Sequence, residues 1–273
     1  MKTGLKSVRL TEDKNDLSAV IAASIGQKKR NLVAQQAAVV AAYDYYANEL
    51  SNSKLKPLTF SPAVHKAYYS LFDGKGPTVK KIKAYIKSDA EDVCLYCSLN
   101  DYDSLDHYLP RANFPEFSMS SRNLVPICTI CNRDWKKQIW GGGSARPFLH
   151  PNFDYIDSVD YLVCDVSIKS NALLIKFNID KTKIEDGVLA DVLANHFKNL
   201  DLASRLRKRT QKDEVDDLIR SMQGKLTIVE KEAALRGYVT QLLRNKQDIR
   251  LQAFYKGVHD VIPTIAATQW ALV

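Results

Sequence analysis

The stretches Cys94-Leu95-Tyr96-Cys97 and Cys128-Thr129-Ile130-Cys131 decide the fold of this chain. A Cys-x-x-Cys turn places two sulfur atoms on one side of a tight knuckle, and two knuckles supply the four thiolate ligands of a tetrahedral zinc site. The alternatives are scattered buried thiols or a redox pair, but a redox pair should lie beside a βαβ pattern and none surrounds either Cys-x-x-Cys turn. We therefore predict a structural zinc ion bound by Cys94, Cys97, Cys128 and Cys131.

Thirty residues separate the two pairs, more than the ~15–20 of a minimal zinc ribbon, so further structure must lie between them. Within and after that interval are Asp106-His107-Tyr108-Leu109-Pro110, Arg122-Asn123-Leu124-Val125-Pro126-Ile127-Cys128 and Cys131-Asn132-Arg133-Asp134-Trp135-Lys136. His107 precedes Asn123 by 16 residues, and Asn123 precedes Asn132 by nine. Over about residues 94–137 the sequence resembles the HNH, or ββα-metal, endonuclease family in its zinc-bound branch.

The resemblance implies an α+β, mostly helical fold in which a zinc-bound ββα core is flanked by helical regions. It implies hydrolysis of DNA with a catalytic Mg²⁺ or another divalent ion held by Asp106 and Asn132, whose oxygen atoms suit such ions. His107 would be the general base, because its unperturbed pKa of about 6.5 suits neutral pH. Asn123 would tie the two strands together and orient the His107 ring. The third family position is Asn132 rather than histidine, a common substitution.

Three further residues are candidate substrate contacts. Arg111 and Lys136 could bind phosphates beside the scissile bond, and a solvated positive charge is the alternative for each. His150 lies in Arg146-Pro147-Phe148-Leu149-His150-Pro151-Asn152-Phe153-Asp154, which is similar to a segment that follows the core in some bacterial HNH proteins. Its alternative is a structural role in packing. The context of those proteins implies anti-phage defence or a mobile element, with a possible ATPase or sensor partner.

Each core residue also has a structural interpretation, such as a helix N-cap for Asn132. The alternative function is a non-catalytic, zinc-stabilised subunit that binds nucleic acid or another protein. The net charge of +8 permits a polyanionic partner but does not prove one. DNA is the predicted partner, with RNA left open.

The chain is predicted to be a cytoplasmic protein without a membrane partner. Its longest apolar run is Ala37–Tyr43, whereas a spanning helix needs about 20 residues. Glu12, Asp13 and Asp16 lie where the start of a secretory signal should be basic only.

Three regions are expected: an N-terminal helical region (1–90), the zinc-bound HNH core (91–158), and a β-hairpin with a C-terminal helical region (159–273). The patterns predict helices within 13–50 with a break at Gly26, and from Ser61-Pro62 and from Thr78. They also predict core strands near 104–108 and 123–127, a helix over 132–140, and a hairpin of 160–168 with 172–179. Beyond Lys183 the chain should be helical, with breaks near Gly224 and Pro263. Cys164 should be a buried, inert thiol.

Overall fold

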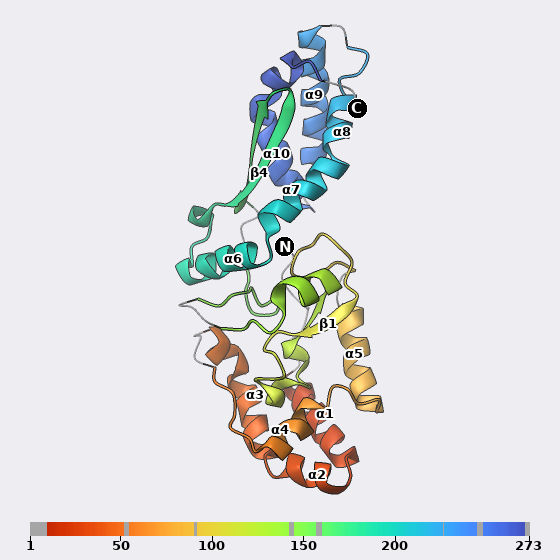
Figure 1. Cartoon of the computed structure of the whole chain (residues 1–273), viewed down its shortest axis with the longest axis vertical. Helices are drawn as coiled ribbons and strands as arrows, with labels where there is room; N and C mark the ends of the chain where they lie inside the picture. Colours follow the sequence, from red (N-terminus) through yellow and green to blue (C-terminus); the bar gives the residue numbers. More distant parts are fainter. Residues whose placement is uncertain are drawn as a thin grey trace. The chain divides into compact units, whose positions relative to one another are not determined.

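The computed structural model describes residues 10–51, 55–89, 92–141, 145–156, 160–225, 227–244 and 248–270. Contacts divide the chain into two compact units, Met1–Tyr155 and Ile156–Val273. The fold is mixed α+β and mostly helical, as predicted (Figure 1). Within these ranges no helix is long and apolar enough to cross a membrane.

The first unit begins with helices that bury aromatic and aliphatic side chains. They are α1 (Leu10–Ala23), α2 (Gly26–Val33), α3 (Gln36–Ser51), α4 (Pro62–Tyr69) and α5 (Pro77–Asp89). The expected break falls at Gly26, whose φ of 59° favours glycine. Tyr43 and Tyr46 of α3 and Tyr68 of α4 are fully buried and belong to the core of the unit, whereas Tyr45 is exposed.

A two-stranded antiparallel sheet follows the helices. Strand β1 (Ser104–His107) pairs with β2 (Leu124–Ile127), close to the predicted bounds. The 3₁₀ turns η1 (Pro115–Phe117) and η2 (Ser121–Asn123) lie between the strands, and the π-helical segment η3 (Ile130–Lys136) follows β2. This segment is shorter than the predicted helix, because Lys137 adopts a left-handed φ of 50° and ends it.

The second unit contains a long hairpin packed on helices. Strands β3 (Leu162–Lys169) and β4 (Ala172–Ile179) confirm the predicted hairpin. Ser170 and Asn171 turn between them with φ of 50° and 59°, as a tight two-residue hairpin requires. Its helices are α6 (Gly187–Asn199), α7 (Leu202–Asp213), α8 (Val215–Arg220), α9 (Ile228–Leu243) and α10 (Ile249–Ala267), and the 3₁₀ turn η4 (Lys181–Lys183) precedes them.

The predicted break at Pro263 is wrong, because α10 continues through it to Ala267. Proline removes one backbone donor, but Ile262 and Ile265 on either side are fully buried. Burial of these side chains holds the helix together across the missing hydrogen bond. The break near Gly224 is confirmed, since it lies between α8 and α9 with a φ of 75°.

Close contact between α10 and β3 predicts that Gly257→Ala destabilises the second unit. A Cβ atom at Gly257 would lie 2.2 Å from the backbone oxygen of Cys164, and backbone cannot move aside as a flexible side chain can. We expect a loss of about 1–3 kcal/mol in urea unfolding, the usual range for overpacking. Gly237→Ala in α9 is the matched control, because its Cβ would meet nothing within 4 Å; it should gain roughly 0.5–1 kcal/mol. A Gly257→Ala protein as stable as the parent would contradict this packing.

Burial also confirms the expectation for Cys164. The side chain is buried on β3, and this burial raises the pKa of its thiol to about 12. Such a thiol carries almost no thiolate at neutral pH and is correspondingly unreactive.

Candidate functional site

The four cysteines of the two knuckles gather in one buried cluster. Their Sγ atoms all lie within 4.8 Å of one another, and those of Cys97 and Cys128 are 3.9 Å apart. Tetrahedral zinc with thiolate ligands places its sulfur atoms about 3.8 Å apart. The cluster could therefore bind zinc, as the sequence predicted.

Hydrogen bonds to sulfur also fit a metal-binding knuckle. The backbone N–H of Cys131 donates to Sγ of Cys128 at 3.4 Å, and the side-chain amide of Asn100 approaches the same sulfur at 3.7 Å. The contact between the two thiols lowers the pKa of Cys128 and raises that of Cys131. The N–H of Cys131 that donates to Sγ of Cys128 favours the thiolate of that residue, the form that binds a metal ion.

The cysteine cluster joins the two strands to the segment that follows them. Near the first knuckle, the N–H of Leu95 donates to the carbonyl of Pro126 in β2 at 3.1 Å. Cys128 follows the last residue of β2, and Cys131 lies within η3, immediately before Asn132. The same four side chains therefore fix β2 and the start of η3 against the first knuckle.

Segment η3 lies along the face of β1 that carries Asp106. Ser104 and Asp106 point to the same face because side chains alternate along a strand. Asn132 donates from Nδ2 to Oγ of Ser104 at 3.3 Å, and Nζ of Lys136 lies 2.9 Å from Oδ2 of Asp106. The structure therefore brings Asn132 to the side of β1 on which Asp106 lies.

Lys136 is fully buried rather than exposed to solvent. Besides its ion pair with Asp106, its ammonium donates to the carbonyl of His107 at 2.8 Å. Burial raises the pKa of Asp106 to about 6 and lowers that of Lys136, and their mutual attraction partly offsets both shifts. In this arrangement Lys136 is the counter-ion of Asp106, and its ammonium does not reach a surface phosphate.

His107 points to the other face of β1, where its ring is held on two sides. Its Nε2 lies 3.0 Å from the carbonyl of Ser118, and Phe72 packs edge-on with the ring centroids 4.7 Å apart. Because a carbonyl only accepts, Nε2 carries the proton and Nδ1 has a lone pair. Burial lowers the pKa of His107 to about 3, so the ring is neutral at physiological pH.

Asn123 is buried and all of its side-chain bonds join neighbouring segments. Its Oδ1 accepts from the N–H of Leu109 and from the hydroxyl of Tyr46, both at 2.8 Å. Its Nδ2 donates to the carbonyls of Leu109 at 3.1 Å and Phe117 at 3.3 Å. The described contacts of the side chain are therefore with the segment after β1 and with Tyr46 of α3, not with the His107 ring.

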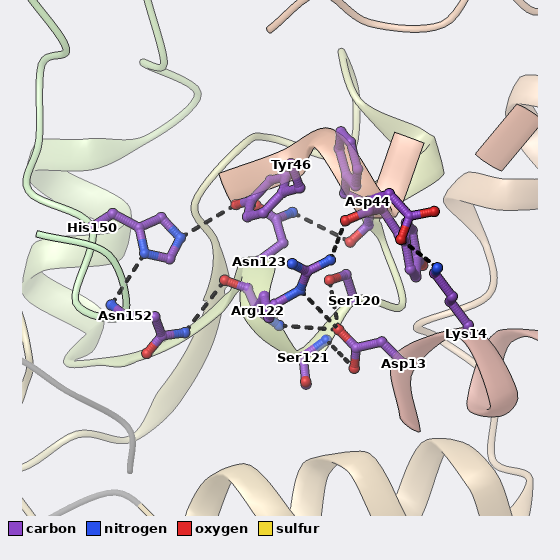
Figure 2. A network of polar contacts seen from close by, with 12 residues as sticks. Asp13, Lys14, Asp44, Tyr46, Ser120, Ser121, Arg122, Asn123, His150 and Asn152 are labelled. Atoms are coloured by element: carbon purple, nitrogen blue, oxygen red, sulfur yellow. Dashed lines mark hydrogen bonds and ion pairs between the residues drawn. The ribbon is translucent and has the colours of Figure 1, made fainter. Parts of the chain in front are cut away.

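Arg111 and His150, the other two candidate substrate contacts, are both engaged within the first unit. Arg111 donates to Oδ1 of Asp73 at 2.8 Å and lies over the ring of Tyr69, with its side chain 24% exposed. His150 is fully buried: Nδ1 accepts from the N–H of Asn152 at 3.2 Å, and Nε2 lies 3.3 Å from the hydroxyl of Tyr46 (Figure 2). Both nitrogens of His150 are engaged by these contacts and are not open to a substrate. The geometry of His150 therefore matches the alternative given above, a structural role in packing.

A cleft of about 590 Å³ lies beside β1. Its lining residues are Phe72, Lys83, Lys87, Asp92, Asp101, Tyr102, Asp103, Ser104 and Leu105. Leu105 and His107 share one face of β1, and Phe72 both lines the cleft and packs on the His107 ring. Phe72 therefore lies between the cleft and the His107 ring. No pattern in the sequence marks Phe72, because its contact with His107 joins two distant segments.

The basic residues of the second unit lie partly on an open helix face. Leu202, Leu206 and Thr210 of α7 are buried, whereas Arg207, Lys208 and Lys212 are exposed. Arg250 is instead held in ion pairs with Glu214 and Asp248. Lys246 lies outside the described residues.

Together these features define a mixed α+β protein with a four-cysteine site that could bind zinc. Over 123 residues the chain is 32% identical to "Protein ea31" of Escherichia phage lambda, a match that covers 42% of this chain. The match spans 39% of the phage protein's own length. No protein-family model matches the sequence, and no solved structure matches it.

Proposed function

We propose that the first unit is a metal-dependent endonuclease that hydrolyses phosphodiester bonds of DNA. The observation that carries this proposal is the state of His107, whose Nε2–H is bonded to Ser118 while Nδ1 has no hydrogen-bond partner within the described part of the chain. A neutral imidazole with an available Nδ1 has the lone pair that a general base needs. Burial lowers the pKa of this ring to about 3, so it is a weaker base than the unperturbed histidine that the sequence suggested. Phe72 and the Ser118 carbonyl hold the ring in that state.

Asp106 and Asn132 are the proposed ligands of the catalytic divalent ion. They are brought to one side of β1, and a carboxylate with an amide oxygen is a donor set that suits Mg²⁺. When bound, the ion would relieve charge on the phosphate and help the departing oxygen. Asp106 would hold the ion while Lys136, which pairs with its Oδ2, remains beside the carboxylate. The zinc cluster would position Asn132 through the adjoining Cys131.

The cleft beside β1 supports a path for the substrate strand. Lys83 and Lys87 line it from α5 and could contact phosphates. Three aspartates line it as well, so the phosphates would lie toward α5 rather than toward residues 101–103. The similarity to a phage-encoded protein is compatible with a role in a mobile element or in anti-phage defence.

The proposal predicts metal-dependent cleavage that is sensitive to Asn132. Purified protein should nick or cut supercoiled plasmid with Mg²⁺ or Mn²⁺, and not without an added divalent ion. Asn132→Ala should raise the Mg²⁺ concentration needed for half-maximal cleavage by roughly 10–100-fold, the usual effect of disturbing a metal site. Asn113→Ala, an exposed asparagine in the loop after β1, is the control and should cleave like the parent.

Two results would contradict the proposal. Cleavage that ignores both the metal and Asn132 would come from a contaminating nuclease. Tight DNA binding without cleavage under any metal would favour the non-catalytic alternative, in which the Asp106–Lys136 pair is purely structural.

A further inference from the structure

A buried polar network connects the N-terminal helices with the segment that precedes β2 (Figure 2). Asp13 of α1 accepts from the hydroxyl of Ser120 at 2.8 Å and from the N–H of Ser121 at 3.0 Å. The guanidinium of Arg122 lies 3.7 Å from the same carboxylate and donates to the carbonyl of Tyr43 in α3. Buried charges are stable only with such partners. The contacts from α1 and α3 therefore hold the segment of Ser120–Arg122 in place.

In the next part of the network, the donor and the acceptor of each hydrogen bond can be assigned. The N–H of Asn152 can only donate, so Nδ1 of His150 accepts and Nε2 carries the ring proton. Nε2–H then faces the oxygen of Tyr46 at 3.3 Å. Since Oδ1 of Asn123 can only accept, the Tyr46 hydroxyl donates to it at 2.8 Å. Each group in this series therefore fixes the orientation of the next.

Asn123 extends the series to the partner of the proposed general base. Its Nδ2 donates to the carbonyl of Phe117, and the next carbonyl along the chain, that of Ser118, accepts from His107. Ser118 is also fixed by its own hydroxyl, which donates to the carbonyl of Tyr68 in α4 at 2.7 Å. The carbonyl that sets the His107 tautomer is thus held from two sides.

We propose that Tyr46, oriented by His150, is a positioning residue that acts through Asn123 to hold the Phe117–Ser118 segment against His107. This role rests on the proposed function, since it concerns the ring assigned there as general base. In this role the N-terminal helices would contribute to the geometry of the proposed active site.

Tyr46→Phe tests the role, because it removes one hydroxyl and keeps the ring, which packs 4.8 Å from Phe117. Nuclear magnetic resonance of ¹⁵N-labelled histidine distinguishes the two neutral tautomers of a ring without any need for cleavage. In the parent, His107 should show protonated Nε2 and unprotonated Nδ1. In Tyr46→Phe its two nitrogen shifts should move toward each other, and cleavage should slow roughly tenfold, as loss of one positioning hydrogen bond predicts.

Tyr43→Phe is the matched control. Tyr43 is also on α3, is fully buried and packs on Phe117, but its hydroxyl has no hydrogen-bond partner in the described chain. It should leave the His107 nitrogen shifts and the cleavage rate unchanged. A second variant, His150→Phe, keeps an aromatic ring and removes both nitrogens, and it should move the His107 shifts in the same direction as Tyr46→Phe. His150→Phe therefore tests the same role if the Tyr46→Phe protein does not fold.

The two proposals can fail separately. Folded Tyr46→Phe and His150→Phe proteins with parental His107 shifts would overturn the positioning role, whether or not the parent cuts DNA. Shifts that move as expected in a protein that never cleaves would support the positioning and sink the nuclease. Equal shifts in Tyr43→Phe would also overturn it, because the effect would then follow from general disturbance of α3.

Discussion

His107→Ala is expected to lower the rate of plasmid cleavage by about 10²–10⁴-fold, the usual contribution of a general base. The two nitrogens of the ring would have different roles. Nε2–H donates to the Ser118 carbonyl, and Nδ1 would accept the proton from water. Alanine removes the acceptor and leaves the metal ligands and the cysteine cluster in place. The measurement is the initial rate of supercoiled plasmid loss at saturating Mg²⁺.

The comparison needs a histidine that also contacts a backbone carbonyl but is neither the proposed base nor a proposed metal ligand. His65 also places Nε2 against a backbone carbonyl, that of Ala112 at 2.8 Å, so His65→Ala makes a comparable change. It should retain the parental rate. Both variants should keep the parental zinc content and melting temperature. Equal rates for His107→Ala and the parent would refute the assignment of the base.

Patterns within one element predicted the local structure well. Paired cysteines indicated the four-cysteine cluster, and alternation indicated the hairpin of the second unit, because knuckles and strands are specified by neighbours in sequence. The membership of the HNH family stays a prediction. Lys136 is an example of what spacing within one helix cannot predict. Helical spacing places it on the same face as Asn132. Its burial depends on the packing of η3 against β1, which the spacing does not indicate.

Contacts between segments that are distant along the chain could not be predicted from the sequence. The carboxylate of Asp13 bonds the backbone of Ser121, 108 residues away, and Tyr46 bonds Asn123 across 77 residues. Neither pair belongs to a short motif, and a tyrosine at helical spacing looks the same whether its hydroxyl is bonded or not. These contacts explain why regions predicted as separate, 1–90 and 91–158, fall in one compact unit up to Tyr155.

Removal of the metal from the cysteine cluster is expected to unfold the strand region of the first unit and to leave the second unit folded. The two core strands have four residues each, and an isolated hairpin of that size is barely stable in water. Structural zinc sites contribute about 10–16 kcal/mol in small domains, as much as the whole stability of a typical domain, about 5–15 kcal/mol. We therefore expect the strands to depend on an ion bound by the cluster. The second unit has its own hairpin and helices and includes none of the four ligands.

Hydrogen exchange after treatment with a strong chelator would locate this effect, because each backbone amide reports its own protection. Residues of β1, β2 and η3 should lose protection, whereas β3, β4 and α10 should keep theirs. Cys128→Ser should behave like the chelated parent, since serine is a poor zinc ligand. Cys164→Ser provides the control: this buried cysteine of β3 lies outside the cluster, so the variant should retain its zinc. Full protection of β1 and β2 after complete loss of metal would show that packing by the N-terminal helices, through Asp13 and Tyr46, stabilises the strands without the ion.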